Sequence, residues 1–366
     1  MRFDIAYLPG DGIGPEVTAE AARVLRAVGA TFGHEFRFHE GLIGGAAIDA
    51  QEVALTDDTF DMARGCDAIL FGAVGGPKWD DVGGKVPANQ GLFRLRKELQ
   101  LYANLRPVRI FASLVDATPL KPETVQGVDL IILRELIGGL YFAEPRKQWQ
   151  TPDGWHAIDT MAYSEQEIAR IVRVGFELAR SRRKRLLSVD KSNVLQTSSL
   201  WRRVATEVGR EYPDVALTHM YVDACAMELL RNPRDLDVLV MDNTFGDILS
   251  DEASMLGGSL GMMPSASLSG PPAGRVFGLY EPIHGTAPSI AGMDIANPLA
   301  AILSAALLLR YSLGLTEEAL AIERSVGAVL DQGCRTADLA PRGTPVIGTR
   351  EMGTQVADRI TSQPHK

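Results

Sequence analysis

Short apolar runs that stop at a glycine or a charged residue alternate along this chain with segments whose apolar residues recur at helical spacing. The apolar runs, each of strand length, are residues 3–8, 66–72, 128–133, 185–190 and 236–241. Strands that are apolar on both faces are typical of sheets covered by helices on both sides. The pattern therefore predicts an α/β protein with open sheets flanked by helices.

The first of these runs leads into a glycine-rich turn at residues 10–15, GDGIGP, and a helical pattern follows. The glycine spacing is G-x-G-x-G, whereas the dinucleotide fingerprint is G-x-G-x-x-G with an acidic residue about 20 positions later. No acidic partner is obvious at that distance. We therefore interpret the segment as a structural turn between strand and helix, and we do not expect a standard Rossmann fold.

Length and charge narrow the range of partners. The chain has 366 residues, with 37 basic and 46 acidic side chains and a net charge of −9. This length corresponds to about two ordinary domains, and the absence of a basic stripe argues against nucleic-acid binding. The most apolar stretch, residues 298–309, is too short to cross a membrane. Three widely spaced cysteines and an N-terminus that enters a strand directly lead us to expect a soluble, cytoplasmic protein.

Two aspartates four residues apart, Asp247 and Asp251, lie in a helical segment. At that spacing both carboxylates project from one face of a helix, where they repel each other unless a cation lies between them. Carboxylate oxygens suit Mg²⁺ or Mn²⁺, and a solvated acidic face is the alternative. We favour the metal site because apolar residues crowd the same segment. They are Phe245, Ile248, Leu249, Ala253, Met255 and Leu256.

Three arginines, Arg96, Arg106 and Arg134, stand within otherwise apolar patterns. We expect Arg96 on a helix and the other two at strand ends. Strand ends are where α/β proteins bind ligands, and a guanidinium there can hold a carboxylate through two hydrogen bonds. Taken singly, each arginine is better explained by a surface ion pair, and their coincidence with strand ends makes the two explanations about equal.

Two further residues have side chains suited to chemistry. Lys191 ends an apolar strand and could serve as a general base, although one lysine does not establish this role. His284 lies in the Gly/Pro-rich loop 281–288, which is followed by Asn297, Pro298 and an apolar helix. Because no Ser or Cys nucleophile pattern accompanies His284, we expect it to contact a ligand by stacking and hydrogen bonding.

Residues 137–160 stand apart from the strand and helix alternation. Pro152-Asp153-Gly154 is turn chemistry between two extended pieces. The segment therefore predicts a hairpin arm.

Taken in order along the chain, these motifs resemble the β-decarboxylating dehydrogenase family, which includes isocitrate and 3-isopropylmalate dehydrogenases. The most specific match is NTFGDILSD at residues 243–251, continued by GGSLG at 257–261. The isocitrate branch would show Asn-Thr-Glu after the pair at 134–135, which is absent here. The segments that are similar to the 3-isopropylmalate branch are residues 72–80, 95–97, 104–107 and 134–142.

The resemblance implies a two-domain organisation. The first, cofactor-binding domain would comprise residues 1–101 and 258–366, and the second would comprise residues 102–257. The second domain would carry the metal and substrate residues and pair with its counterpart in a homodimer, with 137–160 as the intersubunit arm. The active site would lie in the cleft between the domains and would be shared by the two subunits.

The resemblance also implies a set of site residues. Asp247 and Asp251 of one chain and Asp223 of the other would hold Mg²⁺ or Mn²⁺, while Lys191 and Tyr141 would be catalytic. The residues that would bind the substrate are Arg96, Arg106, Arg134, Asp223, Leu92 and Phe93. Those that would bind NAD are His284, Gly285, Thr286, Ala287, Ser289, Ile290 and Asn297.

The implied activity is the NAD-linked oxidative decarboxylation of 3-isopropylmalate to 4-methyl-2-oxopentanoate, CO₂ and NADH in leucine biosynthesis. Asn89 replaces a usual acidic residue and Phe93 a usual leucine, which leaves another 3-alkylmalate open as the substrate. Ser289 replaces an aspartate that contacts the adenosine ribose, but Ile290 is retained, so NAD is still expected.

Two alternatives to this activity remain. One is the oxidation of D-malate, tartrate or homoisocitrate. The other is a non-catalytic regulatory subunit, which would be expected to lose Lys191, Tyr141 or one of the three aspartates.

Overall fold

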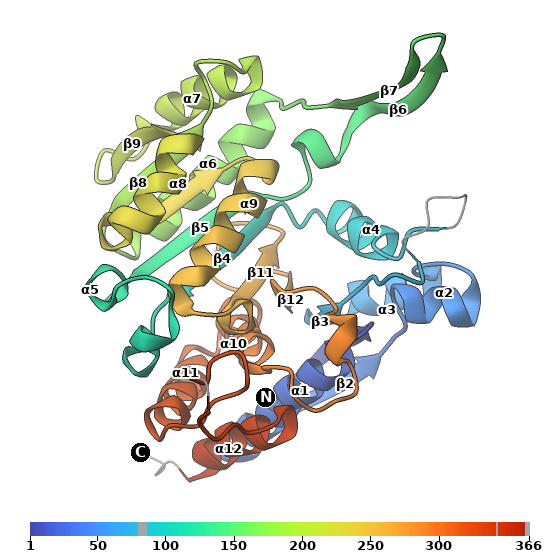
Figure 1. The fold of residues 1–366 in the computed structure, drawn as a ribbon, viewed down its shortest axis with the longest axis vertical. Coiled ribbons are helices and arrows are strands. Elements are labelled where there is room, and N and C mark those ends of the chain that lie inside the picture. The colour runs from blue at the N-terminus through green and yellow to red at the C-terminus, as the bar shows by residue number, and fades with distance from the viewer. Residues whose placement is uncertain (80–85, 342, 363–366) are drawn as a thin grey trace.

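The computed structural model describes residues 1–79, 86–341 and 343–362. Asp80, the last residue of the segment 72–80, lies outside the described residues. The described chain forms a ten-stranded sheet with helices packed on it and a separate two-stranded hairpin (Figure 1). The expected α/β architecture with helix-flanked strands is thereby confirmed.

The sheet has the strand order β2-β1-β3-β12-β11-β4-β5-β10-β8-β9. β11 runs antiparallel to both of its neighbours, and β4 runs antiparallel to β5. The other neighbouring pairs are parallel. The strands are β1 (Arg2–Gly10), β2 (Glu35–Glu40), β3 (Ala68–Ala73), β4 (Ala103–Arg109), β5 (Asp129–Glu135), β8 (Arg185–Asp190), β9 (Ala216–Tyr221), β10 (Val238–Met241), β11 (Pro264–Leu268) and β12 (Gly278–Pro282).

Helices connect most of the strands. α10 is buried along its whole length and packs against α1, β11 and β12, while α12 packs against α1. The beginning and the end of the chain therefore share one half of the molecule (Figure 1). The helices are α1 (Gly14–Phe32), α2 (Gly45–Gln51), α3 (Asp57–Gly65), α4 (Gln90–Glu98), α5 (Pro122–Val125), α6 (Glu165–Arg180), α7 (Gln196–Gly209), α8 (Val222–Arg231), α9 (Asn243–Ser254), α10 (Leu299–Leu308), α11 (Thr316–Asp331) and α12 (Thr349–Thr361).

The segment 137–160 contains an antiparallel hairpin that projects from the body of the molecule (Figure 1). Its strands are β6 (Ala143–Thr151) and β7 (Gly154–Thr160), joined by the Pro-Asp turn that the sequence indicated. Residues 139–141 form a short 3-10 turn before the hairpin begins. Trp149 and Trp155 are exposed on the hairpin, so the chain leaves large aromatic surface without cover there.

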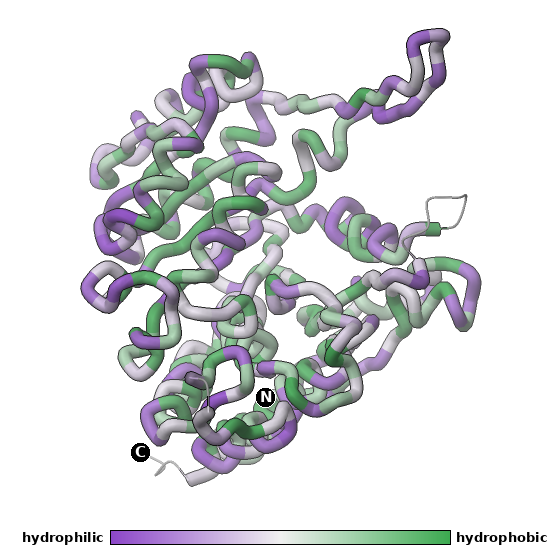
Figure 2. Tube along the Cα trace, viewed as in Figure 1, coloured by the Kyte–Doolittle hydropathy of each residue, from purple (hydrophilic) through white to green (hydrophobic). Residues whose placement is uncertain are grey.

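Apolar side chains form the interior of both halves. Figure 2 shows hydrophobic residues concentrated on the inner strands and hydrophilic residues on the outer helices and the hairpin. Helices α9 and α6 both pack against β5, so helices cover this strand. Within the described ranges, no helix combines the length and the apolar character needed to cross a membrane.

Candidate active site

Two neighbouring strands, β4 and β5, position a pair of buried arginines. Arg106 pairs across the ladder with Ile132, and Arg134 pairs with Asn104, so both guanidinium groups lie on the same face of the sheet. Arg134 lies next to the end of β5, as expected. Arg106 lies in the middle of β4, so the expectation of a strand end was wrong; Pro107 is accommodated within that strand.

Helix α9 covers this face and brings the two aspartates to the arginines. Arg106 Nη1 donates a hydrogen bond to Ser250 Oγ at 2.6 Å and lies 3.7 Å from Asp251 Oδ1. Arg106 Nη2 lies 3.6 Å from Asp247 Oδ1, and Arg134 Nη1 donates to the same oxygen. The guanidinium groups therefore supply positive charge that offsets the repulsion between the two carboxylates.

The surroundings of the aspartate pair differ from the expected apolar frame. Leu249 and Ala253 are buried on the inner side of α9. Ile248 is 61% exposed and Met255 is also exposed, so the frame is apolar on one side only. The prediction was wrong on this point because helical residues next to each other in sequence point in different directions. The open side leaves Asp247 and Asp251, with side chains 38% and 61% exposed, accessible to a ligand.

Burial shifts the pKa values of the charged side chains in this cluster. It lowers the pKa of Arg134 to about 9 and also lowers the pKa of Arg106, and the positive charge of Arg96 acts in the same direction on both. A pKa of about 9 still leaves Arg134 charged at neutral pH. Burial raises the pKa of Asp251, and Arg106 opposes that rise. Buried cations that repel one another are stabilised by an added anion, so the cluster suits a substrate with carboxylates.

Arg96 joins this cluster from α4. Its Nη2 donates to Glu281 Oε1 at 2.7 Å, near the end of β12, and its Nε is buried without a partner among the described residues. An unpaired buried N–H is costly, and a bound carboxylate would satisfy it. The three predicted arginines are thus brought together, while Glu281, which the sequence reasoning did not single out, holds one of them.

Tyr141 lies at the edge of the same cluster. Its hydroxyl donates to Asp247 Oδ2 at 3.2 Å, and its ring lies 5.7 Å from Arg134 Cζ. Burial and the charge of Asp247 raise the pKa of Tyr141, so its hydroxyl keeps its proton at neutral pH. The Tyr141 hydroxyl therefore has a proton to donate at neutral pH.

A cavity of about 640 Å³ adjoins Tyr141, with Phe93 and Phe142 in its wall. The rings of Phe93 and Phe142 meet edge to face with centroids 5.5 Å apart. Leu92, the other predicted alkyl contact, is buried in the core beneath α4. Phe93 is therefore the one of these two α4 residues that lines the cavity.

Lys191 and Asp223 lie next to each other. Lys191 directly follows β8, Asp223 lies in the first turn of α8, and Lys191 Nζ donates to Asp223 Oδ1 at 2.7 Å. The ammonium group lowers the pKa of Asp223. Across the described part of the chain, no three His, Cys, Asp or Glu side chains are grouped to hold a metal ion. A single chain therefore brings Asp247 and Asp251 together but does not add Asp223 to them.

The predicted cofactor loop follows β12. His284 Nδ1 lies 2.9 Å from the Gly285 carbonyl oxygen, and His284 Nε2 is buried without a partner among the described residues. Burial lowers the pKa of His284, so the ring is neutral at pH 7 and can accept or donate one hydrogen bond. Within this loop, Gly285 and Ser289 are exposed, Thr286 is buried, and Ala287 and Ile290 are partly buried.

Asn297 has a different environment from the loop. Its amide nitrogen donates to Asp338 Oδ2 at 3.0 Å, and its amide oxygen accepts from the backbone N–H of Leu299 at 3.0 Å. These contacts fix the start of α10, so Asn297 has a structural task in addition to the expected contact with the cofactor.

Two supporting residues were not identified from the sequence as functional. Asn243 is fully buried; its amide oxygen accepts from Arg134 Nε at 2.9 Å, and its amide nitrogen donates to the carbonyls of Leu136 and Gly138. Asp11 is buried in the glycine-rich turn, and its carboxylate accepts three backbone N–H groups. An acidic residue inside a Gly-rich turn was the signal available for Asp11.

Comparisons with known proteins found a matching family and similar relatives. The sequence model of the family described as isocitrate/isopropylmalate dehydrogenase matches residues 4–356. The chain is 58% identical over 361 residues to 3-isopropylmalate dehydrogenase of Geobacillus kaustophilus, covering 98% of this chain and 96% of that relative. It is 55% identical to 3-isopropylmalate dehydrogenase of Carboxydothermus hydrogenoformans, covering 98% and 95% of the two chains.

Solved structures show the same fold. Isocitrate dehydrogenase from Methylococcus capsulatus superimposes with a TM-score of 0.86 at 33% identity, covering 98% of this chain and all 100% of that one. A β-decarboxylating dehydrogenase from Thermococcus kodakarensis gives a TM-score of 0.78 at 34% identity, covering 98% and 96%. The resemblance found in the sequence is confirmed, and the chain belongs to the isocitrate/isopropylmalate dehydrogenase family.

Proposed function

We propose that this chain catalyses the NAD-linked, metal-dependent oxidative decarboxylation of 3-isopropylmalate in leucine biosynthesis. The products are 4-methyl-2-oxopentanoate, CO₂ and NADH. The observation that carries the proposal is the cluster of buried Arg106 and Arg134 beside the accessible Asp247 and Asp251. The cluster combines cations for substrate carboxylates with oxygen ligands for a metal. Relatives that bear the name 3-isopropylmalate dehydrogenase support the choice of substrate.

The residues of this chain fit a divalent metal. Asp247 and Asp251 project from one face of α9 and are partly exposed, and carboxylates are the ligands that Mg²⁺ and Mn²⁺ prefer. Asp223 of the partner subunit would complete the set. A bound Mg²⁺ or Mn²⁺ would act as a Lewis acid on the oxygen at C2 of the substrate.

The arginines orient the substrate for reaction. 3-Isopropylmalate carries two carboxylates, which match the guanidinium groups of Arg96, Arg106 and Arg134 in charge and hydrogen-bonding geometry. Asn243 holds Arg134 in place by accepting from two of its nitrogens. Positioning of this kind keeps C2 at the cofactor and holds the departing carboxylate in a fixed orientation.

Two proton transfers are assigned to side chains. Lys191 of the partner subunit, as the neutral amine, would accept or relay the proton of the 2-hydroxyl, and a bound NAD would supply the acceptor for the hydride of C2. After CO₂ departs, Tyr141 donates its phenolic proton to C3, for which its raised pKa and its place beside Asp247 are suited.

The loop after β12 fits NAD. The buried Nε2 of His284, which has no partner among the residues that the structure describes, offers a polar contact, and exposed Gly285 lets a ligand approach the backbone. Ser289 has a hydroxyl in the position we assign to the ribose of the adenosine. We expect Ser289→Asp to lower the KM for NAD and to raise the KM for NADP, because a carboxylate accepts from ribose hydroxyls and repels a 2′-phosphate. A rise in the KM for NAD would contradict this placement of the ribose.

A second candidate is the oxidation of a malate with a different 3-substituent. It is favoured by Phe93, which lines the 640 Å³ cavity together with Phe142 and changes the shape of the wall. D-malate, tartrate and homoisocitrate are further possible substrates under this second candidate function.

We further propose a homodimer that works in the cytoplasm. The support for the dimer is that Asp223 stands away from the other two aspartates in a single chain and that the projecting hairpin exposes Trp155. The support for the compartment is that Cys66, Cys225 and Cys334 are free thiols.

A steady-state assay with Mn²⁺ tests the function. It compares 3-isopropylmalate, isocitrate, D-malate, tartrate, homoisocitrate and longer 3-alkylmalates, each with NAD and with NADP. We expect the highest kcat/KM for 3-isopropylmalate with NAD. If another substrate is far better, the second candidate holds. If none is turned over, a non-catalytic subunit holds and the proposal is wrong.

A further inference from the structure

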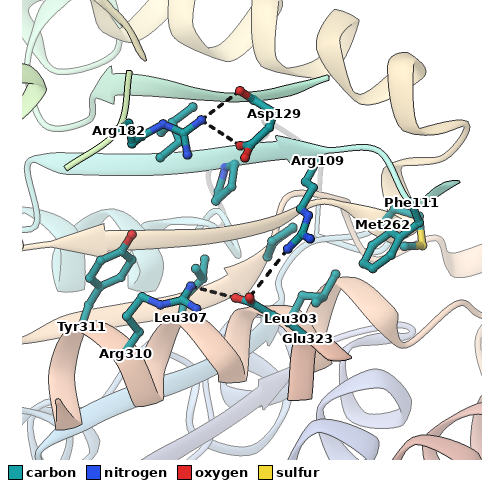
Figure 3. A pocket seen from close by; sticks show the side chains of 13 residues that line it. Arg109, Phe111, Asp129, Arg182, Met262, Leu303, Leu307, Arg310, Tyr311 and Glu323 are labelled. Atoms are coloured by element: carbon teal, nitrogen blue, oxygen red, sulfur yellow. Dashed lines mark hydrogen bonds and ion pairs between the residues drawn. The ribbon is translucent and has the colours of Figure 1, made fainter. Parts of the chain in front are cut away.

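A cavity of about 220 Å³ lies behind the arginine cluster, on the opposite face of β4 and β5 (Figure 3). Arg109 and Pro107 of β4 line it, and they pair across the ladder with Asp129 and Ile131 of β5, which also line it. Side chains alternate along a strand, so these four residues point away from the face that carries Arg106. The cavity is therefore separate from the proposed active site.

The floor of this cavity is apolar. Leu303 and Leu307 of α10 and Met262, which precedes β11, are all buried and line it. Figure 3 shows Leu303 and Leu307 along the helix below the cavity and Met262 beside Phe111 at one end. An apolar floor under a charged rim is typical of sites for small amphipathic molecules.

The rim carries an excess of positive charge. Arg310 Nη1 lies 2.7 Å from Glu323 Oε1, and Arg109 Nη1 lies 3.9 Å from Glu323 Oε2. One carboxylate therefore faces two guanidinium groups, as Figure 3 shows. Arg109 has the longer contact and a side chain that is 64% exposed, so it is the less neutralised of the two.

The other wall does not supply the missing negative charge. Arg182 pairs with Asp129 at 2.8 Å and with Asp237 at 2.9 Å, and Asp237 also lies 3.5 Å from Arg183. Asp237 and Arg183 lie behind this wall, and the lining itself carries three arginines, Arg109, Arg182 and Arg310, and two carboxylates, Asp129 and Glu323. One positive charge is left over, and the geometry places it at Arg109.

We propose that this cavity binds a small monocarboxylate with a short alkyl chain. The carboxylate pairs with Arg109, and the alkyl chain lies on Leu303, Leu307 and Met262. A single negative charge matches the single excess positive charge, and the apolar floor distinguishes such a ligand from inorganic phosphate.

Calorimetric titration of the full-length protein tests this proposal with 4-methylpentanoate as the probe. Acetate, inorganic phosphate and the uncharged 4-methylpentanamide are titrated in parallel. We expect saturable binding of 4-methylpentanoate, with acetate and phosphate at least about tenfold weaker because they leave the apolar floor empty. The amide keeps the alkyl chain but lacks the charge, so it should bind roughly three- to tenfold more weakly than 4-methylpentanoate. No saturable binding up to about 10 mM, or equal affinity for phosphate, would overturn the proposal.

Two variants should change the affinity in opposite directions. Arg109→Gln removes the less neutralised cation, and we expect it to weaken binding roughly three- to tenfold. Glu323→Gln removes the carboxylate that competes with the ligand, and we expect it to strengthen binding by a similar factor. If the affinity is the same in both variants, the carboxylate does not bind at Arg109.

Two further variants locate the site. Arg2→Gln is a matched control, since Arg2 is 61% exposed and pairs with Glu35 on the outer strands, and it should leave the affinity unchanged. Arg134→Gln removes a guanidinium from the other face of the sheet and should also leave it unchanged. Loss of binding in Arg134→Gln with normal binding in Arg109→Gln would place the ligand in the arginine–aspartate cluster and overturn the proposal.

Discussion

Asp11 shows how one buried side chain can hold several loops. Its carboxylate accepts from the backbone N–H groups of Gly45 and Ala46, both at 2.8 Å, and of Gly75 at 2.9 Å. Ile13, two residues further along the same turn, donates its N–H to the Thr286 carbonyl oxygen at 2.9 Å. The Asp11 carboxylate therefore ties the glycine-rich turn to the start of α2 and to the loop after β3 through hydrogen bonds to a charged acceptor, and a backbone hydrogen bond from Ile13 joins the same turn to the proposed cofactor loop.

Removing this carboxylate should loosen the start of α2, the loop after β3 and, through the turn itself, the proposed cofactor loop. We expect Asp11→Ala to lower the free energy of unfolding by about 3 kcal/mol, because buried N–H groups are left unpaired. It should also raise the KM for NAD more than it lowers kcat. The variant Asp11→Asn keeps one acceptor oxygen, so its unfolding free energy and its KM for NAD should lie between those of the unchanged protein and those of Asp11→Ala.

Urea unfolding and steady-state kinetics measure these effects. Asp61→Ala is the control, since Asp61 is exposed and pairs only with Arg64 in the described structure. An unfolding free energy of Asp11→Ala equal to that of the control would refute the role of Asp11.

At the level of single residues, the sequence indicated which side chains have chemical uses but not what holds them. Arg134 and Asp247 could be identified because their types and spacing are unusual in an apolar context. The partners of Asp11 lie 34 to 64 residues away in sequence. Contacts of that range depend on the fold, so neither the partners of Asp11 nor the support of Arg134 by Asn243 could be predicted from local patterns.

At the level of elements, strand β5 contributes to two different sites, because its side chains alternate between the two faces of the sheet. Arg134 faces α9 and the proposed active site, while Asp129 and Ile131 face the second cavity. Its last residue, Glu135, is fully buried and accepts from Gly138 N–H at 2.8 Å and from Arg170 Nη2 at 3.3 Å. Burial raises the pKa of Glu135 from 4.5 to about 7.

The raised pKa of Glu135 makes stability depend on pH. Between pH 4.5 and about 7 the folded chain holds a proton at Glu135 that the unfolded chain releases. Stability therefore falls as pH rises through this window, by about 3 kcal/mol from this group. Glu135→Gln cannot titrate, so it should be more stable than the unchanged protein at pH 8 and should lose that advantage towards pH 4.5.

Urea unfolding at a series of pH values tests this prediction. The difference between the two proteins isolates Glu135 from other acids with raised pKa, such as Asp242 at about 6. A difference that does not change with pH would show that Glu135 has an ordinary pKa.

The hairpin of β6 and β7 should matter for assembly. We expect replacement of Trp149 and Trp155 by serine to shift the protein from two chains to one in sedimentation velocity, because large exposed aromatics mark protein contacts. Activity should fall with the loss of the dimer. Val346→Ser, which also removes an exposed apolar side chain, is the control. A double variant that sediments as two chains would contradict a role of these tryptophans in the dimer.

Four of the five strands that the sequence predicted are buried on both faces, whereas β11 and β12 are equally buried and were not predicted. β3, β5, β8 and β10 were each visible as short apolar runs. The edge strands β2 and β9 have largely exposed or partly exposed residues and lacked that signal. The strand order was also beyond local patterns, since β12 pairs with β3 across some two hundred residues of sequence, as Tyr280 with Leu70 shows.

At the level of the whole molecule, the proposed catalytic residues fall into two groups. Arg106, Arg134, Tyr141, Asp247 and Asp251 share one cluster. Lys191 and Asp223 form a separate pair after β8 and at the start of α8. We infer that each active site takes the first group from one chain and the second pair from its partner. A variant with a defect in the first group and a variant with a defect in the second pair can therefore form one intact active site when they combine in a mixed dimer.

Mixed dimers of Lys191→Ala and Asp251→Asn chains test this shared site most directly. Each variant alone should lose at least roughly 100-fold in kcat, because one lacks the base and the other a metal ligand. In a mixed dimer, one of the two sites has both defects and the other has none.

The measurement is the NADH formation rate of differently tagged variants that are co-expressed and purified together. With random pairing, half of the dimers are mixed and half of their sites are intact, so we predict about a quarter of the activity of the unchanged protein. Activity that stays at the average of the two separate variants would contradict a site shared between two chains.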